Sequence, residues 1–218
     1  MLTDLEVNEI IRLLEERYPE PYCALEYEKD YELLFSARLA AQCTDARVNT
    51  ITPVLFGRFP TLEMIAAADI SEVESIIYSS GFYRAKARDI VSAAAMLLSD
   101  YGGRVPDTMD ELLRLPGVGR KTANLMLGDI HQKPAVVVDT HCIRLSNRIG
   151  FVETKDPYKI EKTLRDVLPP EKSSDFCHRL VLHGREVCAA GKPKCSECCI
   201  AKLCKKRGVT GQVLGVRC

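Results

Sequence analysis

The chain has 218 residues, ten cysteines and no tryptophan. Hydrophobic residues make up 46% and charged residues 28% of it, which is typical of a globular protein and excludes a disordered or fibrous chain. No apolar stretch is near the ~18 residues that a membrane span needs, and the acidic start is unlike a signal peptide. We expect a soluble intracellular protein of two small domains.

Charge is balanced overall, with 30 basic and 30 acidic residues, but it is unevenly distributed. Residues 1–35 carry ten acidic side chains against three basic ones, whereas residues 181–218 carry eight basic side chains against two acidic ones. A local excess of positive charge is typical of a surface that binds a polyanion, although a solvated basic tail explains it equally well.

Helix signals dominate the chain. Thr3 and Glu6 form a capping box, and residues 83–101 predict a long helix that ends at Gly102. The run 136–138, three valines between helices, indicates a buried connector rather than a strand. The sequence therefore predicts an all-α fold of about ten helices. Further helix N-caps are expected at Asp30, Thr44, Thr61, Ser71, Thr108 and Asp156.

The segment Leu-Pro-Gly-Val-Gly-Arg-Lys at 115–121 joins a short helix to the next one. Gly117 and Gly119 permit backbone conformations that are closed to other residues. The turn leaves N–H groups unpaired at a helix N-terminus, where a DNA phosphate can bind without the base sequence being read. An ordinary connection between two helices is the alternative, but the Arg120–Lys121 pair that follows favours phosphate binding.

Lys121 is a candidate nucleophile in the first turn of that second helix. The positive end of the helix dipole and the adjacent Arg120 both disfavour its ammonium form. A neutral amine is the form that attacks in nucleophilic catalysis. A surface lysine without a role is the alternative.

Asp139 follows the valine run at the start of a new helix. Aspartate is a favoured N-cap, and a purely structural cap is the simpler interpretation. Alternatively, the carboxylate stays ionised there and stabilises positive charge that develops on a substrate. We expect nearby His141 to pack or to form hydrogen bonds rather than to catalyse or to bind a metal.

Four cysteines near the C-terminus have the spacing of a metal centre: Cys188-x6-Cys195-x2-Cys198-x5-Cys204. Zinc sites usually bring together two tight pairs of ligands, whereas this pattern has one tight pair with long, unequal arms. The spacing leaves both zinc and an iron–sulfur cluster open. Cys199 is an alternative ligand that spacing does not exclude.

Together these segments resemble the endonuclease III family of DNA glycosylases, within the helix-hairpin-helix superfamily. The resemblance extends over nearly the whole chain and keeps the order of the family. It rests on the hairpin at 115–121, Val138–His141, Ala41–Asp45, Gly81–Ala87, Leu182–Arg185 and the four-cysteine spacing.

The resemblance implies two helical domains with DNA in the cleft between them. One would be a helical barrel at residues 22–134 that contains the helix-hairpin-helix. The other would combine residues 1–21 and 135–218 and carry an iron–sulfur cluster loop at 188–204. The resemblance also implies a [4Fe–4S] cluster bound by Cys188, Cys195, Cys198 and Cys204, with Cys199 not a ligand.

The implied activity is that of a bifunctional DNA glycosylase and AP lyase of base excision repair. Such an enzyme excises oxidised pyrimidines from duplex DNA and cleaves the abasic site by β-elimination through a lysine Schiff base. Lys121 and Asp139 would be its catalytic residues, facing each other across the cleft. Gln42 would fill the gap left by the extruded base, and Phe82 would lie in a wedge loop. The other implied DNA contacts are Leu115, Gly117, Val118, Gly119, Lys192 and Lys194.

The implied partner is double-stranded DNA with a damaged base or an abasic site, bound by a monomer in the cytoplasm, at the nucleoid, without a membrane. Three departures from the family lie close to Gln42 and touch the helix that leads to it: the family often has a hydrophobic residue at the position of Arg38 and a serine at that of Ala40, and Cys43 replaces a small polar residue. We expect them to affect substrate preference and the geometry of the wedge.

Two alternatives differ from this interpretation. The adenine-mismatch branch of the superfamily lacks the amine at the position of Lys121 and carries a glutamate where this chain has Ala37. A non-catalytic DNA-binding metalloprotein would use Lys121 only as a phosphate contact.

Overall fold

The computed structural model describes residues 2–209, and within that range it contains eleven α-helices and no strand. The predicted all-α class is confirmed. The described chain forms two compact units, one made of the residues up to Tyr22 and from Pro134 onward, the other of Cys23–Lys133. None of the helices in residues 2–209 is long and apolar enough to cross a membrane.

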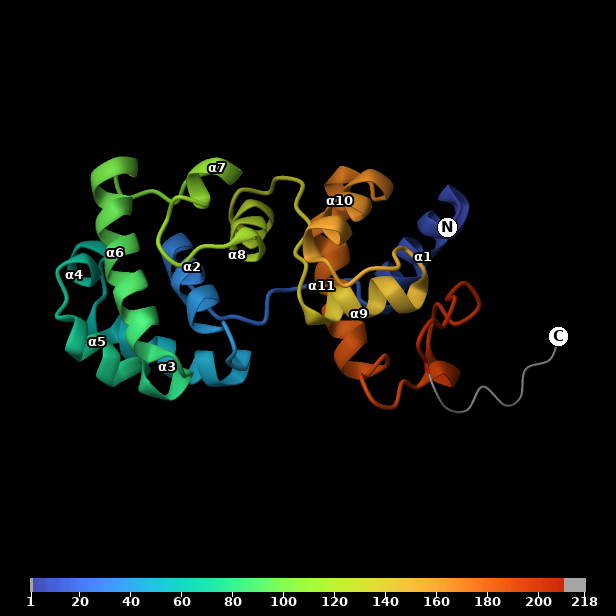
Figure 1. Cartoon of the computed structure of the whole chain (residues 1–218), viewed down its shortest axis with the longest axis horizontal. Helices are drawn as coiled ribbons and strands as arrows, with labels where there is room; N and C mark the ends of the chain where they lie inside the picture. Colours follow the sequence, from blue (N-terminus) through green and yellow to red (C-terminus); the bar gives the residue numbers. More distant parts are fainter. Residues whose placement is uncertain (1, 210–218) are drawn as a thin grey trace. The chain divides into compact units, whose positions relative to one another are not determined.

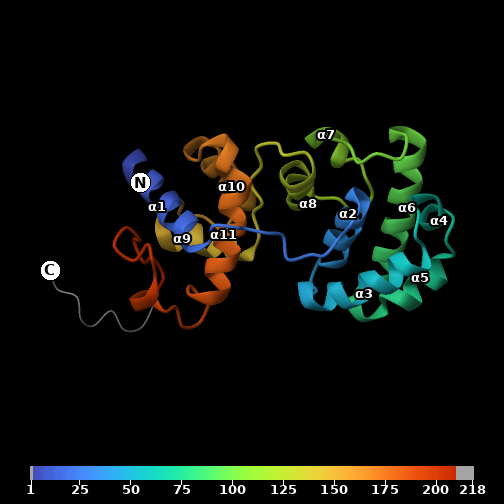
Figure 2. The ribbon, with the colours of Figure 1, turned by 180° about the vertical axis from the view of Figure 1, so that it is seen from behind.

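The Cys23–Lys133 unit is built around the long helix α6, against which α4 and α5 lie (Figures 1 and 2). Its core includes Leu55, Ile65 and Leu97, whose side chains are completely buried. The helices are α2 (Asp30–Leu39), α3 (Asp45–Arg58), α4 (Leu62–Ala66), α5 (Ile70–Ile77), α6 (Tyr83–Tyr101), α7 (Met109–Leu112) and α8 (Arg120–Leu125), with a 3₁₀ turn η1 (Tyr78–Ser80) and a π-helical turn η2 (Met126–Ile130).

Most of the predicted helix starts in this unit are confirmed. The hydroxyls of Thr44, Thr61 and Thr108 each accept the N–H of the residue three positions on. Two predicted caps are wrong. Asp30 is the first residue of α2 rather than its cap, and α5 is capped by Asp69, whose carboxylate accepts the N–H of Ser71.

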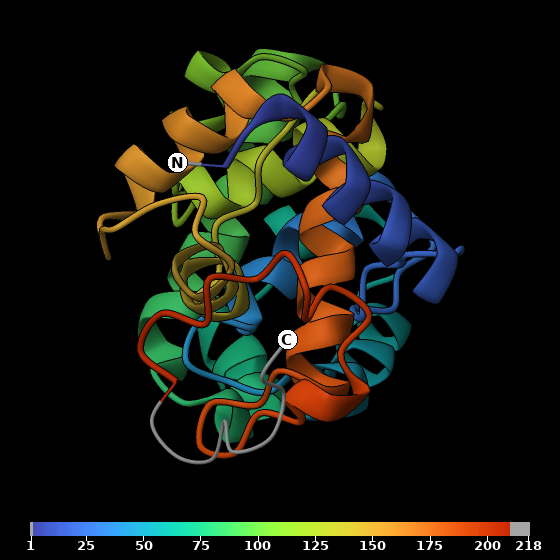
Figure 3. The ribbon, with the colours of Figure 1, turned by 90° about the vertical axis from the view of Figure 1, so that its right-hand side faces the viewer.

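The other unit packs α1 (Asp4–Arg17) and α9 (Thr140–Ile149) against α11 (Ser173–Glu186), as Figure 3 shows for α1 and α11. Its remaining elements are α10 (Pro157–Val167), η3 (Pro170–Lys172) and η4 (Cys195–Glu197). The valine run at 136–138 is a buried connector that leads into α9, as predicted.

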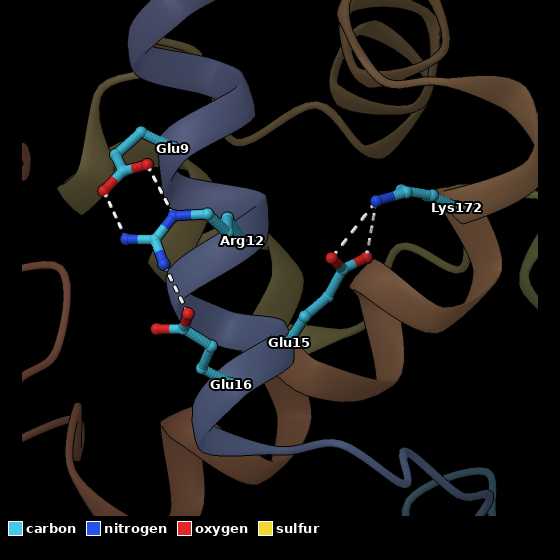
Figure 4. Close-up of polar contacts among 5 residues, drawn as sticks. All are labelled: Glu9, Arg12, Glu15, Glu16 and Lys172. Atoms are coloured by element: carbon cyan, nitrogen blue, oxygen red, sulfur yellow. Dashed lines mark hydrogen bonds and ion pairs between the residues drawn. The ribbon is translucent and has the colours of Figure 1, made fainter.

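Ion pairs neutralise some of the acidic side chains near the N-terminus (Figure 4). On α1, Arg12 binds Glu9 at 2.6 Å and also pairs with Glu16, while Glu15 reaches Lys172 of η3 at 3.0 Å. Exposed pairs of this kind contribute on the order of 0.2–1 kcal/mol each. The apolar face of α1 therefore does most to hold it against α11.

Candidate active site and metal-binding pocket

The turn between α7 and α8 has the tight geometry expected of a hairpin. Gly117 has φ +75°, and a Cβ atom there would lie 2.7 Å from Nε of Arg38 and 2.8 Å from Oδ2 of Asp89. A larger residue there would have a strained backbone and would displace Arg38 and Asp89. Gly119 differs, because its backbone is extended at φ −106° and an added Cβ would meet nothing within 4 Å. Gly119 therefore does not use the conformational freedom that glycine permits, whereas Gly117 does.

The outer surface of this turn is accessible. Gly117 and Gly119 are exposed and Val118 is half-buried, whereas Leu115 is only 2% exposed. The Leu115 side chain supports the turn from inside, and its carbonyl accepts the N–H of Val118 at 3.1 Å. The buried side chain of Leu115 therefore shapes the hairpin from inside, and its contact with DNA stays a prediction.

Arg38 lies beneath the hairpin. Its Nε donates to Oδ2 of Asp89 on α6 at 2.7 Å, and both side chains lie against Gly117. Arg38 thus contacts the hairpin, and its effect on the wedge and on substrate preference stays a prediction.

Lys121 is exposed in the first turn of α8, two residues after the N-cap Gly119. Its ammonium has no hydrogen bond or ion pair within residues 2–209. The helix that carries it is anchored by Ala123 and Leu125, which are buried. The result is an amine on a rigid support, next to an accessible glycine turn and available to an external reactant.

Asp139 is the N-cap of α9. Its Oδ1 accepts the N–H of Cys142 at 2.7 Å, and no partner of Oδ2 is found among the described residues. The cap and a chemical role are therefore compatible. As expected, His141 forms hydrogen bonds within the unit: its Nδ1 lies 3.0 Å from Nη2 of Arg144, and both side chains pack against Gly184.

Gln42 and Phe82 stand at the tips of two loops in the Cys23–Lys133 unit. Both are exposed, and both have left-handed backbones, with φ +56° and φ +51°. Residues other than glycine rarely adopt this conformation, and it persists where the surrounding structure imposes it. Phe82 is 68% exposed, which is unusual for a phenyl ring.

The four predicted cysteine ligands line a single pocket, together with Arg148, Pro193 and Lys194, whereas Cys199 is not part of its lining. In residues 2–209 no group of three or more potential ligands is arranged to hold one metal ion. A zinc ion needs all its thiolates within about 2.3 Å of one point. Sulfurs distributed around a cavity instead fit an iron–sulfur cluster, in which each thiolate binds its own iron.

N–H groups face two of these sulfurs, which suits thiolate ligands, and a histidine ring nitrogen lies near a third. Nη1 of Arg148 donates to Sγ of Cys188 at 3.4 Å, and the backbone N–H of Lys206 donates to Sγ of Cys204 at 3.4 Å. Nε2 of His183 lies 3.3 Å from Sγ of Cys198. Burial lowers the pKa of His183 to about 4, so its ring is neutral at neutral pH and can donate from one nitrogen only.

Sequence reasoning assigned no role to Arg148 or His183. Each lies on the buried face of an amphipathic helix, where a charged or titratable side chain needs a partner. Their position on that face was the one feature of the sequence that could have pointed to a role for them. Arg148 also donates to the carbonyls of Ala189 and Ala190, at 2.8 and 2.7 Å. It so fixes the start of the loop at 188–204 that carries the four cysteines, the cysteine loop.

The cysteine loop, the red segment of Figure 3, is joined at its C-terminal side to the end of α9 by backbone hydrogen bonds. The backbone N–H of Lys205 donates to the carbonyl of Ile149 at 3.0 Å, and that of Arg207 to the carbonyl of Arg148 at 3.2 Å. Lys192 and Lys194 are exposed on the loop. Cys218 and Arg217, the end of the basic segment, lie outside the described residues.

Residues 35–170 match the family of HhH-GPD superfamily base excision DNA repair proteins. The chain is 45% identical to an endonuclease III of Synechocystis sp. over 198 residues, 90% of each chain, and 40% identical to that of Bacillus subtilis over 207 residues, 94% of each. A solved structure of a trapped endonuclease III–DNA covalent intermediate matches with a TM-score of 0.89 at 40% identity, covering 94% of this chain and 97% of the other. The chain belongs to the endonuclease III family of the HhH-GPD superfamily.

Proposed function

We propose that the protein is a DNA glycosylase and AP lyase of base excision repair that removes oxidised pyrimidines from duplex DNA and then cleaves the abasic strand. The observation that carries this proposal is the exposed amine of Lys121, unpartnered within residues 2–209, in the first turn of α8. An amine is the group that forms a covalent bond with DNA through a Schiff base. The match to a trapped covalent endonuclease III–DNA intermediate supports this chemistry.

The reaction begins with extrusion of the damaged nucleotide from the duplex, because the bond to be broken is inaccessible within the base stack. The neutral amine of Lys121 attacks C1′ of the sugar, and the bond from C1′ to the base breaks with its electron pair leaving on the base. The nitrogen loses its protons as the sugar ring opens to an imine. Removal of a proton from C2′ then expels the 3′ phosphate and breaks the strand.

Asp139 supplies negative charge for this sequence. The oxygen that does not cap α9 can accept a proton from the ammonium of Lys121, which leaves the neutral amine that attacks, and can stabilise positive charge on the sugar. Lys121 and Asp139 belong to different units, so each role is assigned from the surroundings of that residue within its own unit. We also propose that these units are the two functional domains of the enzyme.

Three surfaces are assigned to DNA. The hairpin at Gly117, Val118 and Gly119 would bind a backbone phosphate through main-chain N–H groups. Gln42 and Phe82 would enter the duplex at the extruded nucleotide. Lys192 and Lys194, exposed on the cysteine loop, would contact the backbone electrostatically, so that affinity falls with salt.

We propose that Cys188, Cys195, Cys198 and Cys204 bind a [4Fe–4S] cluster. When bound, the cluster cross-links the cysteine loop through four iron–sulfur bonds. The loop has little apolar material of its own, since Ile200 is its main buried side chain. The four thiolates would therefore hold the basic loop in the shape that presents its lysines.

Covalent trapping tests the proposed function. The full-length protein is incubated with duplexes that each carry one damaged base, in the presence of a hydride reductant, and base release, nicking and adduct are measured separately. We expect an adduct with oxidised pyrimidines that maps to Lys121 and is lost, together with nicking, in Lys121→Gln. Base release without any adduct would contradict the proposal and indicate a glycosylase that uses water. DNA binding without base release would indicate the non-catalytic metalloprotein.

A further inference from the structure

Lys86 is a fully buried cation that the proposed reaction does not use. It lies on the inner face of α6, with an exposed fraction of 0%. No carboxylate forms an ion pair with it within residues 2–209, and burial lowers the pKa of its ammonium. Burying a charge is costly unless hydrogen bonds replace its water shell. The protein therefore retains Lys86 at a cost that its contacts have to offset.

Those contacts are two backbone carbonyls from different parts of the chain. Nζ of Lys86 donates to the carbonyl of Leu39 at 2.7 Å and to that of Ser80 at 2.8 Å. Leu39 is the last residue of α2 and Ser80 the last of η1. Carbonyls at a helix end have no partner in the helix, and a buried ammonium is a strong donor for them. The side chain thus ties two helix ends together.

Each tied carbonyl lies just before an exposed loop tip. Gln42 follows Leu39 by three residues, and Phe82 follows Ser80 by two. Only four residues other than glycine have positive φ within the described part of the chain, and these tips are two of them. A strained backbone needs firm support on both sides. Lys86 supplies such support to both loops at once.

We propose that Lys86 is a positioning residue that holds the Gln42 and Phe82 tips at a fixed separation, so that both can enter the duplex at the extruded nucleotide. The inference rests on the proposed function, in which these tips contact DNA. Its structural part, a tether between two loops, stands on the hydrogen bonds alone. Lys86 acts through the loops and contacts no reacting atom.

A fluorescence experiment on the free protein tests the tether. Because the natural chain has no tryptophan, Phe82→Trp places a single indole at one tip. Fluorescence anisotropy decay of the full-length, cluster-loaded protein is compared with and without Lys86→Met, which removes the donors and keeps the length of the side chain. We expect a larger fast component, reporting local motion of the tip, when Lys86 is replaced.

The matched control is Leu97→Ala, also on α6 and completely buried but bonded to neither loop. It lowers the stability of the same helix without cutting the tether, so the fast component should not grow. Equal anisotropy decays in Lys86→Met and its parent, or an equal change in Leu97→Ala, would overturn the inference. If Lys86→Met does not fold, Lys86→Gln, which has N–H donors but a shorter reach, is measured with the same expectation.

A DNA-binding experiment, with Phe82 retained, connects the tether to recognition. We expect Lys86→Met to lower affinity for a duplex with a tetrahydrofuran abasic analogue by about tenfold and to leave affinity for undamaged duplex unchanged. The hairpin and the basic loop, which contact the backbone, do not depend on Lys86. Equal losses on both duplexes would overturn the inference. A natural chain without preference for the abasic analogue and without base release would count against the proposed function, whereas the anisotropy result would still decide the tether.

Discussion

Gly117 packs directly on the guanidinium of Arg38, so closely that a single methyl group at residue 117 would overlap Nε at 2.7 Å. The hairpin turn and helix α2 are therefore in contact at a point where any side chain would displace Arg38 and Asp89. Positive φ at Gly117 adds a second reason for glycine. The nearby Gly119 has neither constraint. Substitutions at Gly117 therefore test the shape of the hairpin, and substitutions at Gly119 test its ability to bind a ligand.

The first prediction compares the two glycines. Gly117→Ala should distort the turn, lower stability by about 1–3 kcal/mol and weaken binding to damaged and undamaged duplex alike. Gly119→Ala should lower stability by less, about 0.5–1 kcal/mol, because its new methyl group points into open space but alanine is a poorer N-cap for α8 than glycine. It should still weaken binding to both duplexes if a phosphate approaches the backbone there. Chemical unfolding and DNA titrations measure the two effects.

The comparison can fail in an informative way. Full DNA affinity in Gly119→Ala would mean that no ligand approaches this part of the turn. A loss confined to damaged DNA would instead assign the hairpin to the pocket of the extruded base.

The second prediction concerns the ion pair beneath the hairpin. Arg38 and Asp89 are 21% and 27% exposed in their side chains, so the pair is partly screened by solvent. In a double-mutant cycle with Arg38→Met and Asp89→Asn, we expect a coupling free energy of about 1 kcal/mol in chemical unfolding. Arg38→Met should also weaken DNA binding through the hairpin while leaving the preference for damaged DNA intact. A changed preference for damaged over undamaged DNA would indicate that Arg38 acts on the wedge.

Local chemistry in the sequence predicted much of this fold. Caps with a short side chain and a free hydroxyl, such as Thr44 and Thr108, determine their own helix starts. Asp30 and Ser71 were assigned incorrectly because neighbours one or two residues away compete for the same role. The N-cap is the residue directly before the first one with helical backbone angles. Where several polar residues stand near a helix start, the sequence pattern alone does not say which of them takes that position.

Contacts between segments that are distant in the chain could not be predicted from the sequence. The spacing of the cysteines indicates a metal centre, but the contacts that Arg148 and His183 make with the cysteine sulfurs come from α9 and α11 and depend on the packing of these helices. The role of Lys86 depends on two carbonyls 47 and 6 residues away. A lysine in a helical pattern reads as exposed until the fold shows which face it occupies.

The third prediction separates the cysteine ligands from Cys199. Cys198→Ser should lose the metal centre, its broad visible absorption and its iron and sulfide, and should make the loop at 188–204 sensitive to proteolysis. Cys199→Ser should keep all of these, because Cys199 is not part of the pocket lining. Metal and sulfide analysis after anaerobic preparation provides the measurement. A colourless natural chain with stoichiometric zinc would contradict the cluster.

The last prediction divides the two roles of Asp139. Asparagine is as good an N-cap as aspartate but carries no charge, so Asp139→Asn should keep α9 intact and lower the rate of base release by about 10²-fold or more. Asp139→Ala loses the hydrogen bond to the N–H of Cys142 as well, which should lower stability by a further ~1 kcal/mol. Single-turnover base release and chemical unfolding measure the two effects independently.

Asp156 provides the matched control, since it caps α10 in the same unit by accepting the N–H groups of Tyr158 and Lys159. Asp156→Ala should lower stability by about 1 kcal/mol, as a lost cap does, and leave base release unchanged. Asp139→Asn keeps the cap of α9 and loses only the charge, whereas Asp156→Ala loses the cap of α10. Slower base release in Asp139→Asn than in Asp156→Ala would therefore indicate a chemical role for the carboxylate of Asp139. If Asp139→Asn released base at the natural rate, Asp139 would be a structural cap alone, and the charge that supports Lys121 would have to come from another carboxylate.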